Sequence, residues 1–554
     1  MTSLPSRTFK AGTWDKCDRA AWLALLLTSL LRLTQLTRFE LAPDEAYYWD
    51  WSRRLAWGYY DQGPMIAYVI RLTTTLFGTN EFGVRFGVWA ASLGTILCCW
   101  LLARRLFSPL AGLLTVLLLA ATPLMAVGSL IATYDPLLVF FWALALVFLE
   151  RALFGPTAAG QRRAWLLAGI ATGLGFLSKH TMVLALPCVV LFLLISPAHR
   201  KWLQRPEPYA AFLLSLLLYT GVLWWNATHH WWTFGHLLFL THKSTNSPFL
   251  RLGEFVGSQA LLLGPGLFLA ALSVGYYIIQ NRNLSPQKEA QRFLFCFGYP
   301  IFFFFCLVAF RTKVQANWAP CAWLTPTILW AEWASEAWTN KVRTMKAGAR
   351  NQYAADEEQN GQNGKTEPAR SGWLSSVAFR FAAVLGTSML LTLLLVSPEL
   401  RQAVGIRLKP KDDVTVQMEG WRSMAAHVQQ LRTDMERGGH KVFLAGNGYQ
   451  YCALIAFYLP DHPQTYDMFL HYRLTMYAAY VTRLKTHLGE DAIFLNDGRA
   501  DDHDLRTVFE HVEWEEPPFA IWRRPLNIEP VRLIHIGRCY RYRRYTGLEW
   551  AVGG

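Results

Sequence analysis

Long apolar stretches recur along the chain and define its architecture. A helix needs about 20 mostly apolar residues to cross a bilayer, and the sequence offers this pattern repeatedly. We therefore predict about eleven membrane-spanning helices, of which the fifth and sixth are closely coupled. They lie at about 20–37, 82–104, 109–130, 136–154, 163–178, 180–196, 208–225, 257–279, 293–310, 317–336 and 376–397.

The pattern of apolar residues changes after the last of these spans. Residues 441–446 and 491–497 are short apolar runs that end in turn residues, which predicts two buried strands. Residues 420–438 and 450–459 favour helices, the first of them amphipathic. We expect a polytopic α-helical membrane domain over residues 20–397 and a C-terminal α/β domain over residues 398–554. Between the last two spans, residues 339–373 are polar and predict a disordered cytoplasmic linker.

Charge distribution orients the helices. Only 17% of the residues are charged and 53% are hydrophobic, so the net charge of +14 does not indicate nucleic acid binding. Basic residues gather in cytoplasmic loops of membrane proteins. If residues 1–19 are cytoplasmic, every inner loop is basic, from Arg104 and Arg105 to the linker. The first loop, 38–81, and the α/β domain then lie outside the cytoplasm, where Cys452 and Cys539 have the option of a disulfide.

The first outer loop carries several acids among many aromatic side chains. Asp44 and Glu45 follow the first span, and Asp61 lies further along. The aromatic residues, Tyr48 and Tyr60 among them, suit either the headgroup level of the membrane or stacking on sugar rings. Either Asp44 or Asp61 is a candidate general base. The alternative for Asp44 is that it only caps a helix that starts at Glu45.

Two short outer turns add further polar side chains. Asp135 precedes Pro136 between two spans, and an acid at a membrane edge is a functional candidate. It also fits a helix N-cap, with Pro136 at the first helical position. Lys179 and His180 lie between two apolar runs. Lys179 either extends toward the headgroups or binds a phosphate.

The last two outer loops contain histidine, lysine and aromatic residues. His242 and Lys243 lie in the loop 226–255, and His242 together with Asp61 is a candidate ligand pair for a divalent cation. The alternative is an interfacial role, because the histidine spacing matches no tight zinc pattern. Lys313, with Asn317 and Trp318, forms an outer patch suited to a lipid phosphate. No glycine-rich nucleotide loop is present, so we expect no nucleotide cofactor.

Seven motifs occur in an order that is similar to that of a known family: 44–49, 60–64, 134–136, 175–179, 315–320, 420–421 and 456–460. The chain resembles bacterial GT-C glycosyltransferases, in the protein-mannosyltransferase-like group that includes lipid A aminoarabinose and galacturonic acid transferases. The resemblance implies a polyprenyl-phosphate sugar donor and a lipid, glycan or protein acceptor. It also implies transfer at the outer face of the bacterial inner membrane, among membrane lipids.

The resemblance also assigns roles to individual residues. It implies that Asp44 is catalytic, that Asp135 is a second essential acid, and that Asp61 binds a metal or positions the site. Asp61-Gln62 stands where aminoarabinose transferases have a Glu-Lys pair, which argues against an aminoarabinose donor. The other candidate substrate contacts are Tyr48, Tyr60, Gln62, Lys179, His180, Lys243, Lys313, Asn317 and Trp318.

We expect a direct displacement at the anomeric carbon, with inversion, in which Asp44 is the base and Glu45 either is catalytic as well or only orients the loop. A transporter of lipid-linked sugars is one alternative, and it requires ionisable residues near the bilayer midplane and internal symmetry. A non-catalytic membrane scaffold is another, and it leaves Asp44, Asp61 and Asp135 unexplained together. These alternatives differ in whether the three acids meet at one place.

Overall fold

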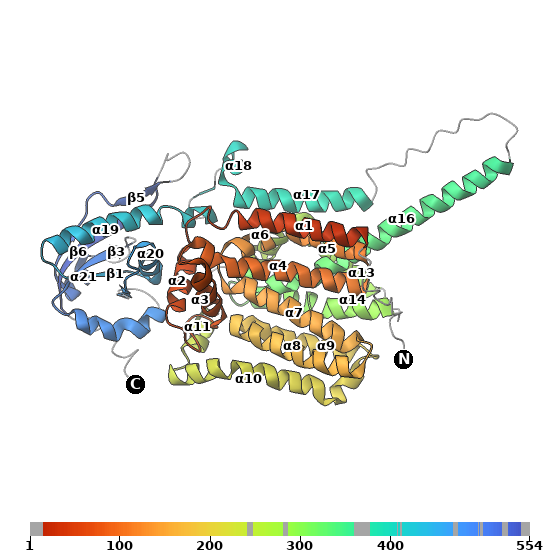
Figure 1. Cartoon of the computed structure of the whole chain (residues 1–554), viewed down its shortest axis with the longest axis horizontal. Helices are drawn as coiled ribbons and strands as arrows, with labels where there is room; N and C mark the ends of the chain where they lie inside the picture. Colours follow the sequence, from red (N-terminus) through yellow and green to blue (C-terminus); the bar gives the residue numbers. More distant parts are fainter. Residues whose placement is uncertain are drawn as a thin grey trace.

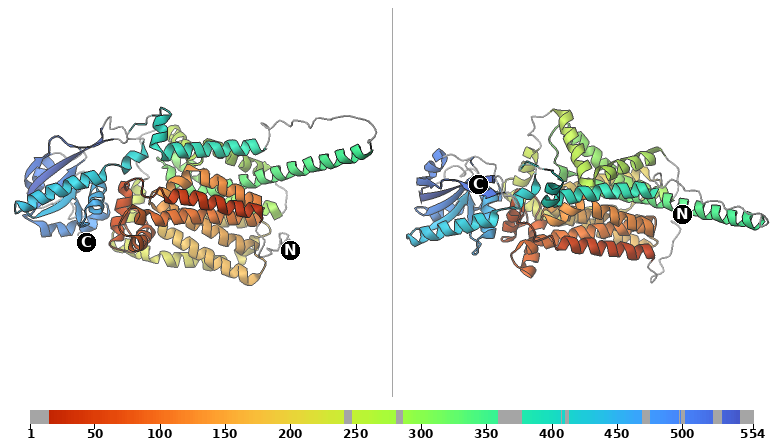
Figure 2. Two further views of the ribbon diagram at one scale, coloured as in Figure 1. Left: turned by 45° about the horizontal axis from the view of Figure 1, so that its top comes forward. Right: turned by 90° about the horizontal axis from the view of Figure 1, so that it is seen from above.

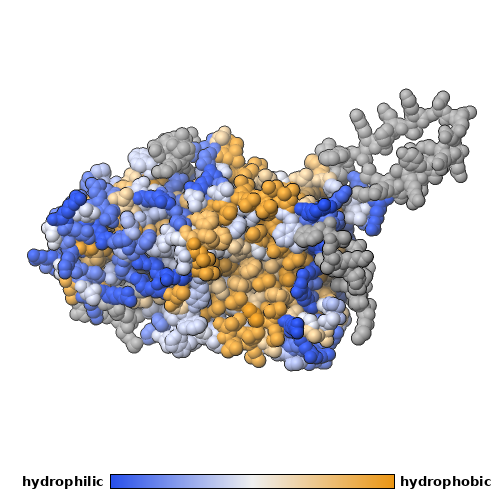
Figure 3. All heavy atoms as spheres, viewed as in Figure 1, coloured by the Kyte–Doolittle hydropathy of each residue, from blue (hydrophilic) through white to orange (hydrophobic). Residues whose placement is uncertain are grey.

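A computed structural model describes residues 15–240, 247–280, 286–358, 377–406, 408–409, 413–468, 475–496, 498, 502–522 and 530–543. A bundle of long helices and an α/β domain lie end to end in this structure (Figure 1). A hydrophobic band crosses the bundle between two hydrophilic ends, as expected for a chain that spans a membrane (Figure 3). The α/β domain contacts one end of the bundle, and helix α1 begins at the other (Figures 1 and 2).

The bundle consists of helices packed side by side. They are α1 (Lys16–Leu33), α4 (Glu81–Leu106), α5 (Pro109–Ala121), α6 (Pro123–Leu130), α7 (Tyr134–Phe154), α8 (Ala158–Ser178), α9 (Ala185–Ile195), α10 (Pro206–Thr228), α12 (Pro248–Leu263), α13 (Pro265–Gln280), α14 (Pro286–Cys296), α15 (Tyr299–Ala309), α16 (Leu324–Glu358) and α17 (Val377–Val396). Short 3-10 helices join some of them, at η1 (His180–Leu184), η2 (Arg200–Gln204), η3 (Ala316–Trp318) and η4 (Pro320–Trp323).

Fewer helices than predicted are individually long and apolar enough to cross a membrane. Among the described residues, five are long and apolar enough to cross a membrane, or up to seven if each bent pair counts as one span. The predicted spans 109–130 and 257–279 are not straight helices. α5 and α6 meet at an angle of 61°, and α12 and α13 at 105°. Proline follows each break, at Pro123 and Pro265, and proline cannot continue a helix across its own position.

The predicted linker is wrong in its first half. Residues 339–358 continue helix α16, which projects beyond the bundle (Figure 1). Alanine, lysine, arginine and glutamate recur here, and they favour a helix even without apolar periodicity. The remainder of the predicted linker, 359–373, lies outside the described residues.

The α/β domain contains a mixed sheet of β1 (Val442–Gly446), β2 (Thr465–Asp467), β3 (Asp491–Asn496), β4 (Phe509–Trp514), β5 (Phe519–Trp522) and β6 (Pro530–Tyr542). The order is β2-β1-β3-β6-β4, with β5 also paired to β6. β1 is parallel to β2 and β3, and β6 is antiparallel to its neighbours. Its helices are α18 (Pro398–Ala403), η7 (Val414–Met418), α19 (Trp421–Arg437), α20 (Tyr449–Tyr458), η8 (Met476–His487) and α21 (Asp502–Val508).

The two strands and two helices that the sequence predicted for this domain are present in the structure. The two predicted strands are β1 and β3, and the two predicted helices are α19 and α20. The optional disulfide does not form, because Cys452 and Cys539 are both free and buried, one in α20 and the other in β6.

Three further helices lie in the loops between the spans: α2 (Pro43–Ser52), α3 (Met65–Phe77) and α11 (Trp232–Leu240). α2 and α3 lie between the bundle and the α/β domain (Figure 1). One continuous core of buried apolar residues joins α2 and α3 to α19, α20 and the sheet, with Trp51, Ile66, Trp421 and Ile455 among its members. The first loop is therefore fixed between the two domains by hydrophobic packing.

Candidate active site

Glu45 fixes the start of helix α2. Its carboxylate is fully buried and accepts hydrogen bonds from the backbone N–H groups of Ala42 (2.8 Å) and Ala132 (2.7 Å). Arg85 donates to it twice, through Nε at 2.8 Å and Nη2 at 2.6 Å. Every oxygen of Glu45 thus contacts the protein. The prediction that Glu45 is catalytic is inconsistent with this enclosure, which leaves it a positioning role.

Asp44 lies at the second position of the same helix and is exposed. The alternative that Asp44 caps the helix is wrong, because Ala42 is the N-cap residue and Glu45 supplies the capping carboxylate. The Tyr449 hydroxyl, at the start of α20, donates a hydrogen bond of 2.8 Å to Asp44 Oδ1. Asp44 therefore stands at the junction between the first loop and the α/β domain.

The three predicted acids share an electrostatic influence on one tyrosine. The carboxylates of Asp44, Asp61 and Asp135 all act electrostatically on the hydroxyl of Tyr134, at the start of α7. The Tyr134 ring lies 5.7 Å from that of Tyr48, centroid to centroid. Burial, followed by Tyr134 and Asp44, raises the pKa of Tyr48 well above its usual value. Both phenols therefore lie close to carboxylate charge, and Tyr48 stays neutral.

Asp135 is held by two of the residues predicted for substrate binding. Lys179 Nζ lies 2.6 Å from Asp135 Oδ1, and the Asn317 amide donates to Asp135 Oδ2 at 2.8 Å. Lys179 also donates to the Asn317 carbonyl at 2.9 Å. Asp135 is not the N-cap of α7, as its position before a proline suggested, because Thr133 occupies that position. This triad joins three inter-helix segments at one point.

Asp61 has different neighbours. The Tyr47 hydroxyl donates to Asp61 Oδ2 at 2.8 Å, and His236 Nε2 lies 3.6 Å from Asp61 Oδ1. The His236 ring also packs on Tyr60, with 5.1 Å between centroids. These contacts join the turn after α2 to helix α11.

The residue after Asp61 faces a second predicted contact. Gln62 Oε1 lies 3.1 Å from His180 Nδ1, and His180 also packs against the rings of Tyr219 and Phe234. Gly63 follows, and a Cβ at this position would lie only 2.2 Å from the backbone oxygen of Leu177. The absence of a side chain at Gly63 therefore lets this turn contact the end of α8.

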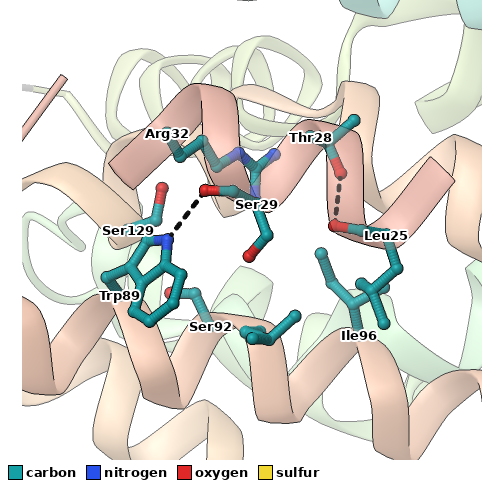
Figure 4. Close-up of a pocket in the computed structure, with 9 residues that line it drawn as sticks. Leu25, Thr28, Ser29, Arg32, Trp89, Ser92, Ile96 and Ser129 are labelled. Atoms are coloured by element: carbon teal, nitrogen blue, oxygen red, sulfur yellow. Dashed lines mark hydrogen bonds between the residues drawn. The ribbon is translucent and has the colours of Figure 1, made fainter. Parts of the chain in front are cut away.

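The remaining predicted residues have other surroundings or lie outside the described residues. Lys313 is exposed, and Trp318 packs on Phe305 of the bundle core. His242 and Lys243 lie outside the described residues. A pocket between α1, α4 and α6 is lined by Leu25, Thr28, Ser29, Arg32, Trp89, Ser92, Leu93, Ile96 and Ser129 (Figure 4). None of the three acids lines it.

The metal prediction lacks a complete ligand set in the part of the chain that the structure describes. No group of three or more histidine, cysteine, aspartate or glutamate residues is arranged there to hold an ion. His236, rather than the predicted His242, is the described histidine beside Asp61. Two such ligands do not enclose a divalent cation, so we derive no step through a metal.

Two residues at the site were not singled out from the sequence. Tyr449 carried no signal, because it lies in another domain. Arg85 could have been identified from the sequence. It is a lone cation near the start of a predicted apolar span, and such residues are usually paired. Its partner, Glu45, is forty residues away in sequence.

The arrangement of helices, outer loop and α/β domain defines a multi-pass membrane protein with a GT-C fold. The crystal structure of ArnT from Cupriavidus metallidurans bound to undecaprenyl phosphate superimposes with a TM-score of 0.60 and 16% identity. The alignment covers 93% of this chain and 97% of that one. At this level of identity the likeness establishes the fold.

Sequence relatives agree with this fold. The family described as dolichyl-phosphate-mannose-protein mannosyltransferase matches residues 61–225. The lipid A galacturonosyltransferase RgtD of Rhizobium johnstonii is 32% identical over 320 residues, 56% of this chain and 64% of the relative. The undecaprenyl phosphate-alpha-4-amino-4-deoxy-L-arabinose arabinosyl transferase of Pseudomonas aeruginosa is 34% identical over 230 residues, 38% of this chain and 41% of the relative.

These matches confirm the resemblance to the protein-mannosyltransferase-like GT-C group that the motifs indicated. The chain spans less than two thirds of the length of either sequence relative.

Proposed function

We propose that the protein is a membrane glycosyltransferase that moves a sugar from a polyprenyl-phosphate donor to a lipid acceptor, with inversion. The observation that carries this proposal is the position of Asp44, an exposed carboxylate at the point where the first loop, α7 and the α/β domain meet. The names of the two sequence relatives, which include lipid A and an undecaprenyl phosphate sugar, support this class of donor and acceptor.

The reaction needs one proton acceptor and one leaving group. Asp44 takes the proton from an acceptor hydroxyl, and the oxygen attacks the anomeric carbon of the donor. The bond from that carbon to the phosphate oxygen breaks, and the polyprenyl phosphate leaves with the electron pair. General base catalysis of this kind contributes roughly 10²–10⁴ in rate.

The Asp135 triad supplies a fixed positive charge beside this site. Lys179 has three N–H donors, and two of them contact Asp135 and the Asn317 carbonyl. We assign the third to an oxygen of the donor phosphate, where the ammonium charge favours departure of the anion. Asp135 and Asn317 then act by holding Lys179 in place. Lys243 and Lys313 remain alternative phosphate contacts.

The orientation of the chain follows from the same proposal. Helix α2, which carries Asp44, and the α/β domain lie at the end of the bundle opposite the start of α1 (Figure 1). The last turn of α4 carries Arg104 and Arg105, and the segment after α9 carries Arg200, Lys201 and Arg205. Basic residues at these ends of the spans favour the cytoplasmic side. We therefore assign the site and the C-terminal domain to the outer face of a bacterial inner membrane, and the N-terminus to the cytoplasm.

The position of the acids also bears on the alternatives. A transporter of lipid-linked sugars needs ionisable groups near the middle of the membrane. The three acids instead precede or follow the spans, at the ends of helices. A scaffold gives no reason for three carboxylates around one tyrosine, since like charges repel.

Substitution of Asp44 by Asn tests the proposal. Lipid A and the other envelope glycolipids are compared by mass spectrometry in cells with the wild type, the variant and no protein. We expect one glycolipid to gain a sugar mass only with the wild type, and D44N to lose at least 99% of that product, consistent with roughly 10² or more in rate. The matched control is D461N, the same change at an exposed acid of the α/β domain that pairs with Arg432.

D461N should retain the product. Full product with D44N would refute Asp44 as the base. Envelope lipids that are identical with and without the protein would refute the lipid acceptor, and would direct attention to glycan or protein acceptors.

A further inference from the structure

Tyr449 connects the α/β domain to the candidate base. It is the first residue of α20, and its hydroxyl lies 2.8 Å from Asp44 Oδ1, although 405 residues separate the two in sequence. The Tyr449 ring packs on Tyr47, with 4.4 Å between centroids. Tyr47 is itself held by two hydrogen bonds, to Asp61 and from the Met476 N–H. The Tyr449 side chain therefore has a fixed support.

The other end of α20 is also fixed to the first loop. The Tyr458 hydroxyl accepts from the Leu41 N–H at 2.6 Å and donates to Glu81 at 3.0 Å. Between the two tyrosines, the buried residues of α20 share one core with α2. Because both ends and the middle of α20 contact the first loop, the position of the Tyr449 hydroxyl is set by the docking of the whole domain.

We propose that Tyr449 is a positioning residue for Asp44, so that the α/β domain completes the active site of the membrane domain. The proposal rests on the proposed function, in which Asp44 is the base. The hydrogen bond from Tyr449 fixes the orientation of one carboxylate oxygen. It also favours the ionised form of the carboxylate, which is the form that accepts a proton.

The surroundings of Asp44 make such a donor useful. On α2 and α7, the groups that share its environment include the phenols of Tyr48 and Tyr134. The carboxylates of Asp61 and Asp135 act on Tyr134 as well. Negative charge nearby favours the protonated form of an acid. Lys179 lies 5.0 Å from the centre of the Tyr134 ring, and its positive charge partly offsets this negative charge. The hydrogen bond from the Tyr449 hydroxyl likewise favours the ionised form of Asp44.

The test compares Y449F with the wild type, as full-length proteins in liposomes. Two donors are supplied in parallel, undecaprenyl phosphate bearing galacturonic acid or 4-amino-4-deoxyarabinose, with lipid A as acceptor. The substitution retains the ring that packs on Tyr47 and removes only the hydroxyl. Activity falls on the acid side as the base takes up a proton, so a higher pKa of Asp44 moves this limb to higher pH.

We expect the limb to move up by about one pH unit and kcat to fall about tenfold, with KM for the acceptor nearly unchanged. The matched control is Y458F, which removes the hydroxyl at the other end of the same helix. It should lower the unfolding temperature without moving the limb, because the buried core that α20 shares with α2 still holds Tyr449 in place.

A readout independent of turnover separates this inference from the proposed function. Infrared difference spectra between each protein and its D44N derivative follow protonation of the Asp44 carboxyl as the pH is changed. A titration in Y449F at the wild-type pH would overturn the inference, even where D44N is inactive. Full transfer by D44N would instead overturn the assignment of the base, whatever the titration shows.

Discussion

The buried pair of Glu45 and Arg85 gives the sharpest prediction on the stability of the site. Glu45 accepts four N–H groups, two on each carboxylate oxygen. In E45Q, one of these oxygens becomes an NH₂ group, which faces two donors instead of accepting from them. The Arg85 guanidinium, 1% exposed, also loses its counter-charge.

The cost of this substitution follows from the burial of both partners. Removing one member of a buried ion pair leaves the other charge uncompensated, and typically costs about 3–5 kcal/mol. Arg85 also donates to the carbonyls of Leu36, Phe39 and Glu40, which connect α1 to α2. We therefore expect E45Q to loosen the whole first loop and to lower the free energy of unfolding by about this amount.

Denaturant or thermal unfolding in detergent measures this loss, followed by the fluorescence of the tryptophans of α2. The matched control is E399Q, the same change in the pair of Arg38 and Glu399, whose side chains are 32% and 60% exposed. A pair this exposed contributes about 0–1 kcal/mol, so E399Q should unfold like the wild type.

The positioning role of Glu45 is refuted if E45Q is as stable to unfolding as E399Q and still transfers no sugar. That result would mean that Glu45 takes part in the chemistry and does not act through the fold of the loop. Loss of activity in proportion to loss of stability is the outcome that the geometry predicts.

Three further predictions concern the site and the domain next to it. G63A should lower the free energy of unfolding by about 1–3 kcal/mol, because the added Cβ meets the Leu177 carbonyl, and an unchanged unfolding temperature would contradict this. K179M should leave the charge of Asp135 unpaired and reduce both stability and transfer, measured by unfolding and by product mass, whereas K179M with wild-type product would exclude Lys179 from the site. Burial raises the pKa of Cys452 well above its usual value, so maleimide should label this thiol only after unfolding, as read by mass spectrometry; rapid labelling of the native protein would refute the buried position.

The fold was largely predictable because its elements depend on local patterns. β1 and β3 are short apolar runs between turn residues, and α19 has apolar residues at helical spacing. The bends at Pro123 and Pro265 have a local cause as well, although apolar composition alone merged each pair into one span. By contrast, β4 and β6 mix exposed and buried positions, so neither shows the continuous apolar run from which β1 and β3 were predicted.

The residues of the site were predictable, but their partners were not. Asp135, Lys179 and Asn317 were each identified from their position at a membrane edge. That they contact one another depends on how α7, α8 and η3 pack, and no periodicity encodes that. The contact between Asp44 and Tyr449 was even less predictable from the local sequence, since it depends on the docking of a separate domain.

The adjacent acids Asp44 and Glu45 show how one helical turn separates two functions. Successive residues of an α-helix point about 100° apart. Glu45 therefore faces the bundle, where Arg85 and two backbone N–H groups enclose it, while Asp44 faces outward to Tyr449. An acid enclosed on every side has no oxygen left for an acceptor hydroxyl, whereas Asp44 is exposed. Glu45 thus holds the helix that carries Asp44. Exchanging the two residues should abolish both roles.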